Sequence, residues 1–146
     1  MSYLADTNIL LRLLQRGDPE HSIVRSSLRT LQQRREQVCY TAQNLVEFWR
    51  VCTRPASVNG FGLSVPETDR RAKVIERLFT LLPDRAEVHT EWRQLVVDCA
   101  VSGVQVHDAR LAAAMHVYGV QHVLTLNVAD FGRYPELVAV HPVDIK

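Results

Sequence analysis

The stretch SYLADTNILL, residues 2–11, joins two apolar runs through a single carboxylate, Asp6. Residues 3–5 are typical of a short buried strand, and the second run is typical of a helix that begins after Thr7 and Asn8. Asp, Thr and Asn side chains often cap the first turn of a helix, which by itself would explain this composition. Ligands of open α/β sheets, however, bind beyond the carboxyl ends of the strands. Asp6 is therefore also a candidate site residue.

The size and composition of the chain indicate one domain, residues 1–146. The sequence is 47% hydrophobic and 23% charged, which is typical of a globular protein. It contains no run of about 20 apolar residues that could span a bilayer, and its N-terminus lacks a secretory signal pattern. We therefore expect a cytoplasmic protein with no membrane partner. The net charge of +1 gives no bulk attraction to nucleic acid, so any such binding requires local patches.

Short apolar runs alternate with amphipathic stretches along the whole chain. This alternation predicts an α/β fold: a single-domain α/β/α sandwich with a mainly parallel four- to five-stranded sheet. The expected strands are 3–5, 38–41, a weak one at 87–89, 123–126 and 138–141. The expected helices are 8–16, 19–35, 43–53, 66–82, 89–102 and 107–118.

Three further carboxylates, Glu47, Asp108 and Asp130, lie in or beside the predicted apolar elements. Glu47 belongs to a strongly apolar helix, and Asp108 shares a helical stripe with inward-facing residues. Each has an ordinary alternative explanation. Glu47 could pair with Arg50 on an exposed strip, Asp108 could complement a helix dipole, and Asp130 could begin a short helix.

Taken together, the four acids are expected at one edge of the sheet. Mutual repulsion there would raise their pKa values and destabilise the fold unless a cation were bound. Ligand sets made only of oxygen favour Mg²⁺ or Mn²⁺ over Zn²⁺. The sequence therefore predicts a Mg²⁺ site, with Mn²⁺ as the alternative ion.

Four segments carry a resemblance to a known family. LADTNILL, NLVEFWRV, VHDARLAAA and VLTLNVADFGRY occur in the order and positions of the PIN domain, and the resemblance runs over essentially the whole chain. The sequence is similar to the VapC-type toxins of bacterial VapBC toxin–antitoxin modules.

The resemblance also assigns roles to particular residues. It implies that Asp6, Glu47 and Asp108 are catalytic, metal-binding carboxylates. Many members have a fourth acid where this chain has Asn127, so Asp130 takes the fourth position here and occupancy of a second metal stays open. The supporting residues implied by the motifs are Thr7, Asn8, Thr125 and Asn127.

The activity implied by this resemblance is Mg²⁺-dependent endoribonuclease activity of a type II toxin. Its substrate would be a tRNA, rRNA or mRNA, and its partners would be a cognate VapB-like antitoxin and a second copy in a homodimer. We expect the antitoxin to occupy an apolar groove between the first helices. The alternative is a catalytically silent PIN module that binds RNA or protein.

Arginines form two candidate RNA-binding faces. Arg25 and Arg29 share one predicted helix, and Arg70 and Arg71 share another. Arginine suits bidentate recognition of phosphate, although charged helical faces are more often simply solvated.

Overall fold

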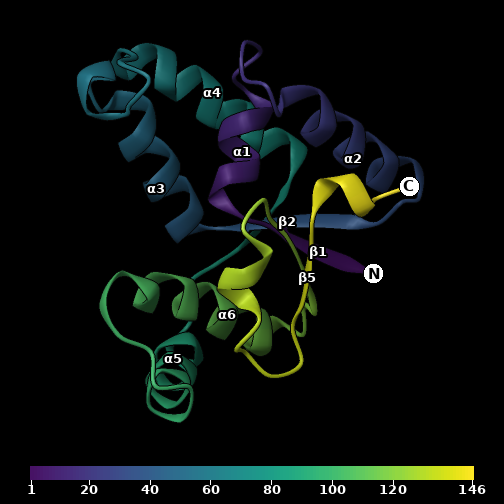
Figure 1. Ribbon diagram of the computed structural model, residues 1–146, viewed down its shortest axis with the longest axis vertical. Coiled ribbons are helices and arrows are strands. Elements are labelled where there is room, and N and C mark those ends of the chain that lie inside the picture. The colour runs from purple at the N-terminus through teal and green to yellow at the C-terminus, as the bar shows by residue number, and fades with distance from the viewer.

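Five parallel strands form the centre of the computed structural model, which describes all residues 1–146 (Figure 1). Their spatial order is β3-β2-β1-β4-β5, and every neighbouring pair is parallel. The strands are β1 (Ser2–Ala5), β2 (Gln37–Thr41), β3 (Thr80–Leu82), β4 (His122–Leu124) and β5 (Val138–Val140).

Helices cover both faces of this sheet (Figure 1). On one face lie α1 (Thr7–Leu13), α2 (His21–Gln33), α3 (Ala42–Thr53) and α4 (Val65–Leu78). On the other lie α5 (Ala86–Asp98) and α6 (Val106–Tyr118). Two separate apolar clusters fill the two interfaces, one of 13 and one of 15 buried residues. The predicted α/β/α sandwich with a parallel sheet is confirmed.

Starting from β1 at the centre, the chain adds strands first on one side of the sheet and then on the other. The chain first passes through β2 to β3 and then crosses to β4 and β5 on the other side of β1. The reversal leaves a crevice beyond the carboxyl ends of β1 and β4, the usual ligand position in such sheets. Because Ala5 pairs with Leu124, the residues that follow, Asp6 and Thr125, lie side by side at this crevice.

One strand prediction was wrong. Residues 87–89 belong to α5, and the edge strand is β3, which pairs with β2. The predicted helix 66–82 therefore ends early, because Phe79 already has extended backbone angles. Pro83 follows the three-residue strand, and a proline is poorly tolerated inside a helix. A strand this short shows no readable periodicity beside the strong pattern of α4.

The helices are of ordinary globular length. The longest, α4, has 14 residues. None is long and apolar enough to cross a membrane.

The loop after α3 folds back onto the end of that helix. Gly60 N donates to Pro55 O, Gly62 N donates to Arg54 O, and Leu63 N donates to Cys52 O, at 2.8–3.0 Å. A Cβ atom at Gly60 would lie 1.9 Å from the backbone oxygen of Arg54, so only glycine fits at this close approach.

We expect Gly60→Ala to lower the free energy of unfolding by about 3 kcal/mol or more, because the clashing atom is backbone and cannot move aside. Chemical denaturation monitored by circular dichroism measures this change. Gly17→Ala is the control, since a Cβ there meets nothing within 4 Å. Equal stability of the two variants would contradict the close packing of this loop.

Candidate active site

Asp6 lies at the end of β1 and is only 8% exposed. Its Oδ1 accepts a hydrogen bond from Thr7 N at 2.8 Å, where it caps α1, and its Oδ2 accepts one from the Thr125 hydroxyl at 2.7 Å. Thr125 follows β4, so the second bond joins the two strands that flank the crevice. Burial raises the pKa of Asp6, and the bonds from Thr125 and Thr7 oppose that rise.

A second layer of contacts orients Thr125. Its Oγ1 accepts from the backbone N–H of Asn127 at 3.0 Å and lies 3.5 Å from Asn8 Nδ2. Asn8 Oδ1 in turn accepts from Leu126 N at 3.3 Å. The expected supporting residues Asn8 and Thr125 therefore contact one another, whereas Asn127 takes part through its backbone.

Glu47, on α3, has both carboxylate oxygens engaged. Thr7 Oγ1 donates to Oε2 at 2.7 Å, and Gln43 Nε2 donates to Oε1 at 2.8 Å. Asn44 Nδ2 donates to Thr7 Oγ1 at 3.1 Å, so Thr7 is held from both sides. The alternative pairing of Glu47 with Arg50 is not formed.

Three of the four predicted acids line one open pocket of about 470 Å³. Glu47 comes from α3, Asp108 from the first turn of α6, and Asp130 from a 3₁₀ turn, Val128–Phe131, after β4. Thr7 lines the same pocket, and Asp6 lies directly before it in the chain. Of the two candidate residues in the last motif, Asp130 lines this pocket and Asn127 does not.

Acidic side chains outnumber cationic ones in the pocket lining, where Glu47, Asp108 and Asp130 accompany one arginine, Arg50. Burial raises the pKa of Asp108 to about 7, and the charges of Asp6, Asp130 and Glu47 add to the rise. The charge of Asp108 also acts on the buried hydroxyl of Tyr134, which has no hydrogen-bond partner. Its pKa is raised to about 12 by burial and then by Asp108. The raised pKa values show that ionisation of Asp6 and Asp108 is disfavoured unless positive charge is added.

The carboxylates of Glu47, Asp108 and Asp130 and the hydroxyl of Thr7 offer oxygen atoms, which are the ligands that a hard dication prefers. The carboxylates do not, however, converge on one point in this structure. No three His, Cys, Asp or Glu side chains lie close enough together to ligate a single ion. Three of the acids therefore share one pocket, and all four influence one another electrostatically, without forming a closed ligand set.

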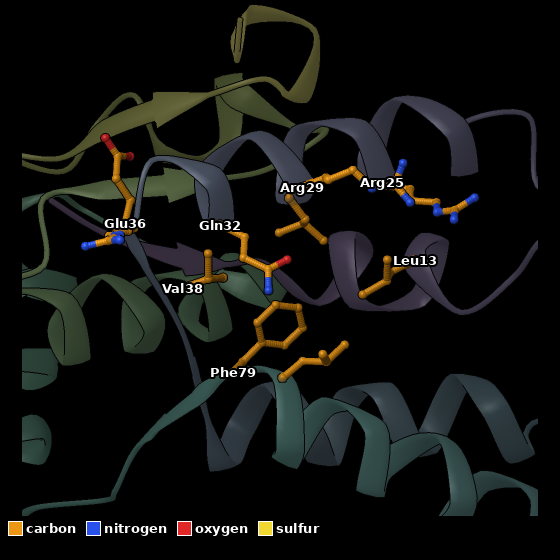
Figure 2. A pocket seen from close by; sticks show the side chains of 10 residues that line it. Leu13, Arg25, Arg29, Gln32, Glu36, Val38 and Phe79 are labelled. Atoms are coloured by element: carbon orange, nitrogen blue, oxygen red, sulfur yellow. The ribbon is translucent and has the colours of Figure 1, made fainter.

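The predicted RNA-binding arginines lie elsewhere. Arg25 and Arg29 line a different pocket with Leu13 and Phe79, as Figure 2 shows. Arg70 pairs with Glu67. Arg71 donates to Leu14 O at 2.7 Å and to Gln15 Oε1 at 3.1 Å, so part of its guanidinium binds the fold itself.

Sequence reasoning missed three polar residues that contact the site: Gln43, Asn44 and Arg110. Gln43 bonds Glu47 directly, Asn44 bonds Thr7, and Arg110 donates to Gln43 Oε1 at 3.2 Å. Gln43 lies four residues before Glu47, a spacing at which helical side chains meet, so that contact could have been found. Arg110 could not, because it reaches α3 from the opposite face of the sheet.

The family model of the PIN domain matches residues 3–137. The chain belongs to the PIN domain family. The resemblance found in the four motifs is thus confirmed, and the five-stranded parallel sheet with its six helices is the PIN fold in this chain. No curated protein matches the chain in sequence.

Several solved structures have a similar fold. VapBC2 from Rickettsia felis, bound to a promoter DNA fragment, has a TM-score of 0.72 at 14% identity, covering 97% of this chain and 98% of that one. FitAcB from Neisseria gonorrhoeae has a TM-score of 0.71 at 18% identity, covering 97% and 99%. VapC20 from Mycobacterium tuberculosis, a sarcin-ricin loop cleaving toxin, has a TM-score of 0.59 at 18% identity, covering 83% and 86%. This PIN domain thus matches VapC-type toxins in fold.

The raised pKa of Asp108 predicts a pH-dependent stability of the metal-free protein. The folded pKa of about 7 exceeds the ordinary aspartate value of 3.8. Ionisation of Asp108 therefore costs the fold nothing below about pH 4, costs more as the pH rises, and reaches its full cost above pH 7. After allowing for solvent screening, we expect Asp108→Asn to stabilise the fold by about 1–2 kcal/mol at pH 8 and not at pH 4.

Denaturation in the presence of a chelator at the two pH values measures this difference. Asp98→Asn, on the exposed face of α5, is the control and should change neither value. A stabilisation by Asp108→Asn that is equal at both pH values would contradict an electrostatic origin.

Proposed function

We propose that this PIN domain is a Mg²⁺-dependent endoribonuclease, the toxin component of a type II VapBC-like module. One observation carries the proposal: Glu47, Asp108 and Asp130, from three separate elements, line one pocket beside the buried Asp6. A fold has no reason to gather carboxylates at such electrostatic cost for stability alone. The match in fold to VapC-type toxins supports the same function.

The positions of the residues suggest a separate role for each of them in the proposed reaction. Asp6 and Asp108 would hold the ion, and Asp130 adds a further carboxylate at the pocket wall. When bound, Mg²⁺ supplies positive charge that stabilises the phosphate's developing negative charge and acidifies water. Glu47, whose two oxygens accept hydrogen bonds from Thr7 and Gln43, would accept a proton from the attacking water. We propose single-stranded or loop RNA as the substrate class, since a solved toxin of similar fold cleaves the sarcin-ricin loop.

A catalytically silent PIN module is the second candidate. The observation that favours it is the absence of a closed ligand set among the acids. Its binding surface would then be selected for RNA or protein, and the carboxylates would have no chemical role.

An RNA cleavage assay separates the two candidates. We expect the protein to cut single-stranded RNA with Mg²⁺ or Mn²⁺ and to stop when a chelator is added. Asp6→Asn should lower the rate by more than about 100-fold, because it removes a buried anionic ligand. Mapping new RNA 5′ ends after brief expression in cells would identify the target.

Asp98→Asn is again the matched control, since it makes the same change at an exposed position of α5 that does not line the pocket. Equal cleavage by wild type and Asp6→Asn would show that the activity comes from a contaminant. The silent-module function would then stand.

An antitoxin partner is the second part of the proposal. The expected groove between the first helices exists: Leu13 of α1, Leu28 of α2, and Leu78 and Phe79 at the end of α4 line it. Figure 2 shows Arg25 and Arg29 projecting from α2 above these apolar side chains. A groove with this apolar lining and cationic rim suits an amphipathic segment that carries acidic residues. Homodimer formation stays a prediction.

The double variant Arg25→Glu/Arg29→Glu tests the groove. It should remain toxic but escape neutralisation by the product of the neighbouring reading frame, because its rim would repel an acidic segment. Growth on co-expression measures the escape. Arg93→Glu, on exposed α5, is the control. Loss of RNA cleavage with neutralisation intact would instead assign these arginines to RNA binding.

A further inference from the structure

Gln43 links the two helical layers at the acidic pocket. It is the second residue of α3, and its Nε2 donates to Glu47 Oε1 at 2.8 Å and to the backbone oxygen of His107 at 2.8 Å. His107 lies in the first turn of α6, directly before Asp108. One amide nitrogen therefore contacts a carboxylate on one face of the sheet and the acid-bearing turn on the other.

Arg110 fixes the orientation of this amide. Its Nη1 donates to Gln43 Oε1 at 3.2 Å, and its Nη2 donates to Asp84 Oδ1 at 3.2 Å in the turn between β3 and α5. Guanidinium groups donate and never accept, whereas the carboxylate of Glu47 and the carbonyl of His107 accept. Only one of the two amide orientations satisfies all three neighbours, so Arg110 keeps the NH₂ group facing Glu47.

No other hydrogen bond or ion pair joins α3 to α6. Both of the hydrogen bonds between these helices pass through Gln43. Apart from this link, α3 packs against α1 and α4, and α6 packs against α5. The relative position of Glu47 and Asp108 therefore depends on this amide more than on direct packing of the helices.

We propose that Gln43, oriented by Arg110, is a positioning residue that holds the Glu47 carboxylate and the Asp108-bearing turn of α6 in the arrangement needed for metal binding and RNA hydrolysis. This inference rests on the proposed function and extends it to two residues outside the acidic set. A long glutamate side chain loses several rotatable bonds of freedom when it is held, so its ordering requires dedicated contacts. Thr7 fixes one Glu47 oxygen and Gln43 fixes the other.

Gln43→Met tests this role, because methionine keeps the length of the side chain and removes its hydrogen bonds. We expect the dissociation constant for Mn²⁺, measured by electron paramagnetic resonance, to rise roughly 10- to 100-fold. The kcat for RNA cleavage should fall by a similar factor, with KM and the thermal midpoint changing little. Gln94→Met is the matched control, since Gln94 contacts Asp98 with the same spacing on exposed α5.

Variants of Arg110 give an independent test should Gln43→Met fold poorly. Arg110→Met removes the donor that orients the amide and should weaken Mn²⁺ binding. Arg110→Lys keeps a cationic donor and should restore part of the affinity. If Arg110 only stabilised the fold, Arg110→Lys would not recover metal affinity while the thermal midpoint stayed unchanged.

A readout without metal or RNA completes the design. In the metal-free protein, the side-chain NH₂ protons of Gln43 should exchange slowly with water by NMR, and Arg110→Met should accelerate that exchange. Fast exchange in the wild type would overturn the proposed link. Slow exchange together with unchanged Mn²⁺ affinity and kcat in Gln43→Met would overturn the positioning role alone. Wild-type protein that neither binds Mn²⁺ nor cleaves RNA would overturn the proposed function, and this role with it.

Discussion

The hydrogen bond from the Thr125 hydroxyl to Asp6 is the contact around which the pocket is organised. It joins the ends of β1 and β4, the two strands between which the chain reverses its direction across the sheet. The parallel register between the strands brings these two residues together. An ionised carboxylate could not be buried at this depth without such donors, because desolvation opposes its charge. The other three acids line the pocket beside Asp6, whose position the sheet determines.

The acidic pocket and the apolar layers have opposite effects on stability. The raised pKa of Asp108 shows that ionising this group costs the fold free energy. Apolar clusters on both faces of the sheet provide the compensating stability, and the buried stripe of α6 behind Asp108 belongs to one of them. In this PIN domain α6 therefore stabilises the fold through its buried apolar face and destabilises it when Asp108 in its first turn ionises. Such local cost is characteristic of functional sites.

The polar residues around the acids fix geometry. Thr7 and Gln43 each hold one oxygen of Glu47, and Asn44 holds Thr7. These contacts connect α1 to α3, and the bond from Gln43 to the His107 carbonyl adds α6, so the contacts span both helical layers. Substitutions at such positions are expected to alter metal affinity and rate before they alter stability.

The sequence by itself determined the parallel α/β/α fold and four candidate carboxylates, because strand and helix periodicity and the ordered motifs are local properties. It did not reveal β3, because Thr80–Leu82 follow α4 almost directly and continue the apolar pattern of that helix. Sequence left both Asn127 and Asp130 as candidates, and the turn after β4 decided that Asp130 lines the pocket. Only the tertiary structure joined Gln43 to Arg110, because their contact depends on two helices meeting across the end of the sheet. Patterns along the chain specify which face of an element is buried, whereas contacts between layers arise only when the layers pack.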